Sequence, residues 1–141
     1  MLQKGCMYCD TVCEHRDSLM IKICEFKQGT LYLFRDQKNL GRCILAANQH
    51  YNDLTEMAPA DLHEFWDEVV TVANAIHRAF NPDKINYGSY ADVVKHLHIH
   101  IVPKYIGGAN WGGPFSDADP KFLSDEEYQK IIDTFKKELG K

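Results

Sequence analysis

The chain has 141 residues, enough for one domain that buries about two thirds of its unfolded surface without help from disulfides. Hydrophobic residues make up 45% of it and charged residues 26%, an ordinary globular composition that argues against disorder. The net charge of -4 provides no basic stripe, which argues against a nucleic-acid partner and favours a small molecule as the ligand.

The chain carries no apolar run of the roughly 20 residues that a membrane-spanning helix needs, and its N-terminus lacks the order of residues typical of a signal peptide. We therefore expect a cytoplasmic protein with no membrane partner. There are five cysteines, and an odd number fits a reducing compartment, where a CxxC pair is more often a metal or redox element than a disulfide. They are Cys6, Cys9, Cys13, Cys24 and Cys43.

The first 18 residues show little periodicity, which predicts a loop or a short knuckle. Cys6 and Cys9 form a CxxC pair, and Cys13 and His15 follow. The pair supplies two of the four ligands of a structural zinc, so two ligand sets compete. Cys13 and His15 would complete a local site, or histidines from the rest of the chain would complete a long-range one, which we favour. Free thiols or a redox pair without a metal are the remaining alternative.

Three apolar-rich segments, 19–26, 31–34 and 42–46, predict consecutive strands with a turn at 38–41, which indicates an antiparallel meander. The clearest helix begins at Pro59 and ends at Asn81-Pro82, with apolar residues at three- and four-residue steps. Its apolar stripe, expected in the core, consists of Leu62, Phe65, Trp66, Val69, Ala73, Ile76 and Phe80.

A fourth strand is predicted at 85–90, and it leads through a turn into residues 96–104, where histidine and aliphatic residues alternate until Pro103. Successive side chains of a strand point to opposite faces, so the aliphatic residues would enter a core while His96, His98 and His100 share the other, exposed face. His96 and His100 would lie roughly 13 Å apart on a straight strand, too far to bind one metal ion. The three histidines are therefore expected to have different roles.

The remainder of the chain reads as a glycine-rich loop followed by a helix. The loop, residues 107–115, carries Trp111 and Phe115. The last helix begins at a capping box, Ser-Asp-Glu-Glu at 124–127, and its role is expected to be structural.

The pattern His-aliphatic-His-aliphatic-His-aliphatic-aliphatic resembles the signature of the histidine triad (HIT) family of nucleotide hydrolases and transferases, and the similarity covers roughly residues 5–115. The resemblance implies a single domain, residues 1–141, with an α+β fold: an antiparallel sheet of about five strands, one long helix and a C-terminal helix. It also implies a homodimer.

In this family the central histidine attacks the α-phosphorus of a nucleoside phosphate conjugate and forms a covalent nucleotidyl-histidine intermediate. The resemblance assigns this catalytic role to His98, and it assigns hydrogen bonding to the phosphate or leaving-group oxygens to His100. A neutral imidazole is a competent nucleophile near pH 7 when its other nitrogen is held, commonly by a backbone carbonyl. The implied substrates are dinucleoside polyphosphates or AMP phosphoramidates.

The resemblance also implies binding residues outside the catalytic pair. Those for the nucleotide are Asp36 at the ribose, Asn86 in an Asn-x-Gly sequence, Ser89 and His100. Those for a structural zinc, found in several branches of the family, are Cys6, Cys9, His50 and His96. One departure precedes the triad, where family members carry Gly-Gln and then Ser or Thr and this chain has Ala-Asp-Val at 91–93.

Two other functions compete with this one. His98 and His100 could bind a catalytic metal in a metal-dependent hydrolase, which requires a third ligand and an open position. The acidic Asp92 favours a non-catalytic nucleotide-binding module, since a carboxylate in contact with a phosphate is unfavourable by about 1 to 4 kcal/mol.

Overall fold

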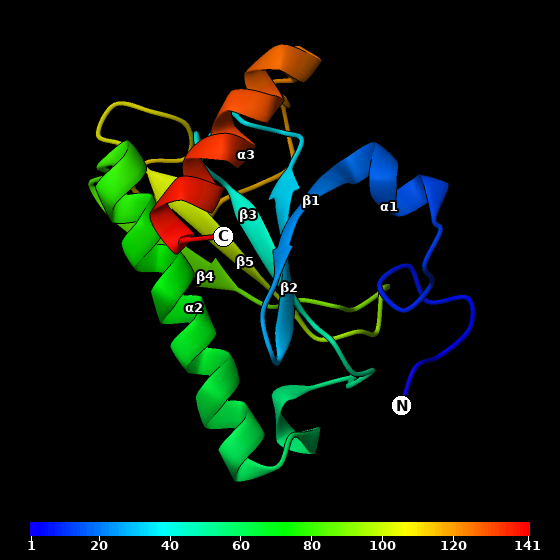
Figure 1. Ribbon diagram of the computed structural model, residues 1–141. Coiled ribbons are helices and arrows are strands. Elements are labelled where there is room, and N and C mark those ends of the chain that lie inside the picture. Colours follow the sequence, from blue (N-terminus) through cyan, green and yellow to red (C-terminus); the bar gives the residue numbers. More distant parts are fainter.

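Five antiparallel strands form one sheet in the order β1-β2-β3-β5-β4 in the computed structural model, which describes residues 1–141 (Figure 1). The strands are β1 (Met20–Glu25), β2 (Gly29–Phe34), β3 (Cys43–Ala47), β4 (Lys84–Gly88) and β5 (His98–Lys104). The helices are α1 (Glu14–Leu19), the short 3-10 helix η1 (Leu54–Glu56), α2 (Pro59–Phe80) and α3 (Asp125–Leu139). The α+β fold expected from the sequence is confirmed.

Two departures from the sequence expectation concern the segments that carry the candidate site residues. Residues 14–19 form α1 inside the segment expected as a loop, because the Cys13 side chain caps this helix by accepting from the N–H of Arg16. A helix of six residues is too short to show apolar periodicity. Strand β5 begins at His98 rather than at His96, and residues 89–97 connect β4 to β5 in place of a tight turn, although the two strands pair as expected.

Helices α2 and α3 lie on one side of the sheet and bury the main hydrophobic core there (Figure 1). The aliphatic residues of the histidine strand lie in this core as expected, with Leu97, Ile99 and Ile101 at most 2% exposed. Phe65 of α2 is fully buried, but Trp66 is 37% exposed. The expectation that Trp66 lies in the core is wrong, because a helix turns by about 100° per residue and position 66 falls beside the stripe that faces the sheet.

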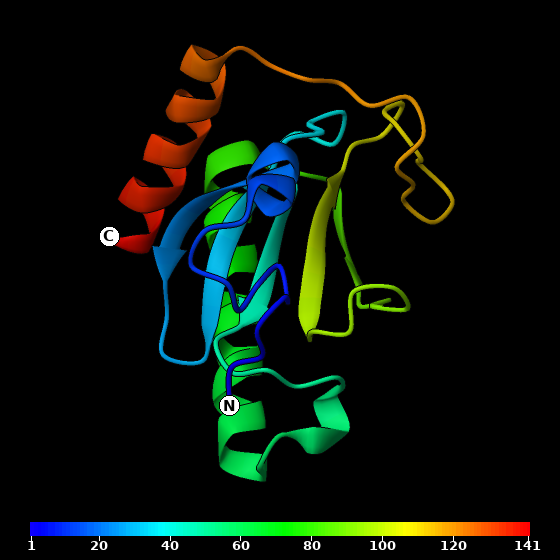
Figure 2. The ribbon, with the colours of Figure 1, turned by 90° about the vertical axis from the view of Figure 1, so that its right-hand side faces the viewer.

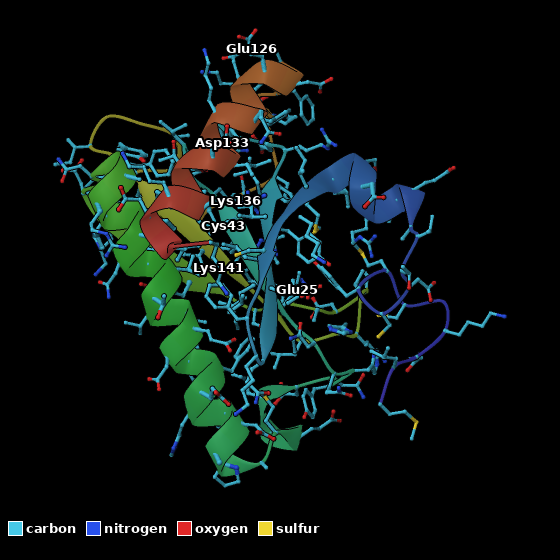
Figure 3. The ribbon with its side chains drawn as sticks, in the orientation of Figure 1. Glu25, Cys43, Glu126, Asp133, Lys136 and Lys141 are labelled. Carbon is cyan, nitrogen blue, oxygen red and sulfur yellow. The ribbon has the colours of Figure 1, made fainter.

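The C-terminal helix α3 begins at the predicted capping box, in which Ser124 and Glu127 each bond the other's backbone N–H. The chain then returns to the outer strand β1, where Lys141 Nζ donates to the backbone carbonyl of Glu25 at 2.9 Å (Figure 3). None of the helices combines the length and the apolar character that crossing a membrane requires. The buried residues of α3 are Tyr128, Ile131, Ile132 and Phe135.

Two irregular segments flank the sheet. Residues 1–13 run in front of β2 and β3, on the face opposite α2, whereas residues 107–124 lie beside β4 and β5 and pass over the end of the sheet to α3 (Figure 2). Buried Arg16 holds the first segment through its guanidinium. The groups that accept from it are the carbonyl oxygens of Met7 (3.0 Å), Asp10 (2.7 Å) and Thr11 (3.2 Å).

Replacing Arg16 with Gln is expected to loosen the N-terminal segment, because three backbone carbonyls lose a charged donor, at a cost of about 2–4 kcal/mol. Hydrogen exchange at the amides of residues 5–11 would become faster, and unfolding would shift to lower urea concentration. Arg78→Gln removes a half-exposed arginine of α2 and serves as the matched control. Unchanged exchange at residues 5–11 in Arg16→Gln would contradict the assigned role.

Candidate functional site

His98 and His100 of β5, and His96 just before this strand, lie on the face of the sheet opposite the helices, and β5 itself lies between β3 and β4. The expectation that the rings are exposed is wrong for two of them, since His96 is 0% and His98 7% exposed. Tyr8 of the N-terminal segment covers both, with its ring centre 5.2 Å from that of His96 and 5.0 Å from that of His98. The first 18 residues show no periodicity, so nothing in the sequence indicated where Tyr8 would lie.

The ring of His96 is oriented by the backbone of β3. Its Nε2 lies 2.7 Å from the carbonyl oxygen of Ala47, and because a carbonyl only accepts, Nε2 carries the proton and Nδ1 the lone pair. Burial lowers the pKa of His96, and the hydrogen bond to Ala47 partly offsets this. The atoms nearest to its Nδ1 are Cys6 Sγ (3.3 Å), Cys9 Sγ (3.5 Å) and His50 Nδ1 (3.2 Å).

The side chains of Cys6, Cys9, His50 and His96, called here the metal-binding cluster, fit a tetrahedral site. Their ligand atoms all lie within 4.8 Å of one another, and the closest are 3.2–3.5 Å apart. In a tetrahedral zinc site with usual bond lengths, ligand atoms are about 3.3 to 3.8 Å apart. The long-range ligand set is thus the one that the structure brings together. The local set is wrong, because Cys13 caps α1 and His15 is exposed on it.

The ring of His98 is oriented by the backbone of His96. Its Nδ1 lies 2.6 Å from the carbonyl oxygen of His96, so Nδ1 carries the proton and Nε2 the lone pair. Nε2 has no hydrogen-bond partner in the protein and is not among the fully buried unpaired atoms, so it keeps some contact with solvent. Burial lowers the pKa of His98, which the hydrogen bond to His96 partly offsets. The ring is therefore neutral near neutral pH.

His100 has the opposite tautomer. Its Nδ1 lies 3.2 Å from Nη2 of Arg42, and because a guanidinium only donates, Nδ1 accepts and Nε2 carries the proton. Burial lowers the pKa of His100 to about 3, and the charge of Arg42 contributes to the lowering. The ring centres of His98 and His100 are 5.3 Å apart. The strand therefore presents a nitrogen lone pair next to an N–H donor.

Arg42, which the sequence analysis did not select, is the buried cation of this site. Its guanidinium carbon lies 4.2 Å from the ring centre of Phe34 and 5.0 Å from that of Phe115. Its Nη2 also donates to Asp117 Oδ1 at 3.0 Å, whereas Nε and Nη1 are buried without an acceptor. Phe115 lies over Gly88, where a Cβ would come within 2.8 Å of the ring. The one signal in the sequence is a charged residue before an otherwise apolar strand.

Asp36, predicted at the ribose, borders a pocket of about 210 Å³ that Phe34 and Asp117 also line. Phe34 connects this pocket to the triad, since its ring centre lies 6.0 Å from that of His100. The carboxylate is 5% exposed and already accepts from two backbone N–H groups, those of Lys38 (3.2 Å) and Lys121 (2.9 Å). A ribose would therefore share this carboxylate with the protein backbone.

The other residues predicted to contact the nucleotide lie elsewhere. Asn86 lines a separate hollow of about 340 Å³ together with Lys84, Lys104 and Trp111. Ser89 is exposed in the connection at 89–97, as is Asp92. Contacts of Asn86 and Ser89 with a nucleotide stay predictions.

His100→Gln is expected to make the free energy of unfolding less dependent on pH on the acid side of neutrality. Folded His100 stays neutral, whereas in the unfolded chain it takes up a proton near pH 6.5, so the free energy of unfolding falls as the pH drops below that value. One such histidine contributes a slope of up to about 1.4 kcal/mol per pH unit between about pH 6.5 and its folded-state pKa.

Urea unfolding of both proteins between about pH 7.5 and pH 4 would measure this slope. Glutamine still offers an acceptor to Arg42, and His96 and His98 remain in both proteins, so the difference between the two curves isolates His100. Parallel curves would mean that His100 titrates alike in the folded and unfolded chains.

Comparisons with known proteins agree with this fold. The model of the family described as HIT domain matches residues 21–107. Adenylylsulfatase HINT3 of Arabidopsis thaliana is 28% identical over 115 residues, 78% of this chain, and the chain spans 57% of the length of HINT3. The solved histidine triad protein SMc02904 of Sinorhizobium meliloti has a TM-score of 0.84 at 24% identity, covering 94% of this chain and 99% of that one. A zinc-bound histidine triad family protein of Mycobacterium smegmatis has a TM-score of 0.61 at 18% identity, covering 89% and 88%.

Proposed function

The chain belongs to the HIT domain family, and from this premise we propose that it is an enzyme, a hydrolase or transferase that cleaves nucleoside phosphate conjugates at the α-phosphorus. The observation that carries the proposal is the pair of opposite tautomers, with a lone pair on Nε2 of His98 and a proton on Nε2 of His100. Attack at phosphorus needs a nucleophile and, close to it, a donor that stabilises the charge developing on oxygen.

In the proposed first step, the Nε2 lone pair of His98 attacks the α-phosphorus, and a P–N bond forms as the bond to the leaving group breaks. The Nδ1 proton stays hydrogen-bonded to the carbonyl of His96, which stabilises the positive ring of the nucleotidyl-histidine. His100 donates from Nε2 to a phosphate or leaving-group oxygen. Water then attacks phosphorus, the P–N electron pair returns to Nε2, and one water proton passes to solvent.

An adenine nucleotide is the substrate we propose, in keeping with the adenylylsulfatase activity in the name of HINT3. The pocket of about 210 Å³ offers apolar side chains such as Phe34 for a base and Asp36 for the ribose hydroxyls. The phosphate would approach His98 along the edge of its ring, because Tyr8 covers the ring face.

The metal-binding cluster is proposed to hold a structural zinc ion. Its nitrogen and sulfur donors and their separations support this, as does the zinc-bound relative from Mycobacterium smegmatis. Four protein ligands would leave no open position, so the ion would stabilise structure rather than bind substrate. Since the carbonyl of His96 holds His98, fixing His96 would also orient the nucleophile.

The metal-dependent alternative has less support. No third His, Cys, Asp or Glu joins His98 and His100 in a metal-binding group, and the guanidinium of Arg42 beside His100 disfavours a second cation there. The non-catalytic alternative is distinguished by activity: AMP binding without turnover of any conjugate would favour it over the enzyme.

His98→Ala is expected to reduce AMP release from adenosine 5′-phosphosulfate and from a dinucleoside polyphosphate by at least about 10³-fold, because the covalent route is lost. His63→Ala, an exposed position on α2, should match the wild type. Mass spectrometry under conditions that preserve P–N bonds should map an AMP adduct to His98. Unchanged turnover in His98→Ala would rule out the proposed nucleophile.

Metal analysis of the purified protein is expected to give one zinc per chain, and Cys9→Ser should lose most of it together with several kcal/mol of stability. Cys24→Ser, in β1 outside the cluster, should keep the wild-type zinc content. An equal zinc content in the two variants, or none in the wild type, would contradict the assigned ligands.

A further inference from the structure

The environment of His100 is built partly from residues beyond the matched HIT domain. Arg42 belongs to residues 21–107, but Phe115 and Asp117, which hold its guanidinium, come from the segment that follows. We propose that Arg42 is a positioning residue that restricts His100 to hydrogen bonding and thereby selects conjugates whose leaving group departs as an anion, such as sulfate or phosphate, over conjugates of amines. The inference rests on the proposed function and specifies its substrate class.

The guanidinium of Arg42 is fixed in position beside His100. It is fully buried between the rings of Phe34 and Phe115, so it cannot swing away from His100 without opening this stack. The two hydrogens of Nη2 serve His100 Nδ1 and Asp117 Oδ1. Because arginine has no acceptor, this contact exists only while His100 Nδ1 is unprotonated.

The charges around His100 disfavour a second proton on its ring. The groups that face it are Arg42 just before β3, His98 from β5, Tyr90 from the connection before β5 and Asp117 from the C-terminal segment. The Asp117 side chain is 76% exposed, so water screens its charge, whereas the Arg42 side chain is 1% exposed. A second proton on His100 would therefore face an unscreened positive charge. His100 can donate a hydrogen bond but does not act as an acid in its imidazolium form.

Leaving groups differ in whether they need a proton to depart. When a P–O bond to sulfate or phosphate breaks, the leaving group takes the electron pair as a stable anion and needs no proton. When a P–N bond breaks, the amine must gain a proton to leave as a neutral molecule. The other nearby proton, on His98 Nδ1, is held by the carbonyl of His96. The site therefore lacks an acid for amines, and the unpaired donors of Arg42 favour negative charge close by.

The test compares adenosine 5′-phosphosulfate with an adenosine 5′-phosphoramidate of a primary amine, which share the AMP moiety. In the wild type, kcat/KM should be at least about 100-fold higher for the phosphosulfate. This factor is the lower end of the rate increase that a general acid provides, and the site lacks such an acid for the amine. Arg42→Gln should lower this ratio by about 10-fold or more. As the pH falls, its phosphoramidate activity should begin to rise at a higher pH than in the wild type, because the charge of Arg42 no longer lowers the pKa of His100, although burial still does. Arg42→Lys, which keeps the charge, should retain part of the preference. Arg78→Gln should behave as wild type.

Equal losses on both substrates in Arg42→Gln, with the ratio and pH profile unchanged, would overturn the inference while leaving the proposed function intact. A wild type that turns over neither substrate would overturn both. If Arg42→Gln does not fold, nitrogen NMR of wild-type His100 decides. Nδ1 unprotonated and Nε2 protonated from about pH 8 to pH 5 is the expected result, and a protonated Nδ1 within that range overturns the inference.

Discussion

One residue, His96, joins the metal-binding cluster to the proposed nucleophile. Its side chain faces Cys6, Cys9 and His50, and its backbone carbonyl accepts from His98 at 2.6 Å. Any shift of His96 would therefore change both the geometry of the metal-binding cluster and the orientation of the His98 ring. The same constraint places the N-terminal segment, because the two cysteines can reach His96 only if residues 1–13 cross the sheet, and Tyr8 then covers His98.

Three chemically identical side chains acquire different properties because each faces a different partner. His96 and His98 face carbonyl oxygens, which only accept, but through different ring nitrogens. His100 faces a guanidinium, which only donates. The alternation of β5 brings the histidines to one face of the sheet, and the neighbouring residues decide where each ring keeps its lone pair.

Sequence patterns predicted those features of the fold that arise within a single helix or strand. The alternation at 96–104 and the apolar steps of α2 arise within single elements, and the structure confirms both elements. The metal-binding cluster was predicted as a set because a CxxC pair and the resemblance together named all four residues. Tyr8, Arg42 and Phe115 were missed, and the burial of His98 with them, because they act between segments far apart in sequence and no local pattern marks such contacts. The homodimer, the domain limits and the roles of Asn86 and Ser89 stay predictions.

The HIT domain model matches residues 21–107, but residues on both sides of this segment contribute to the candidate site and to the core. Cys6 and Cys9 precede it, and Phe115, Asp117 and the whole of α3 follow it. A fragment trimmed to those limits would keep the triad and His50 but lose two of the four residues proposed to bind zinc. It would also open the core at Phe135, which is 0% exposed in the intact chain, and let water reach the guanidinium that the last third of the chain now encloses.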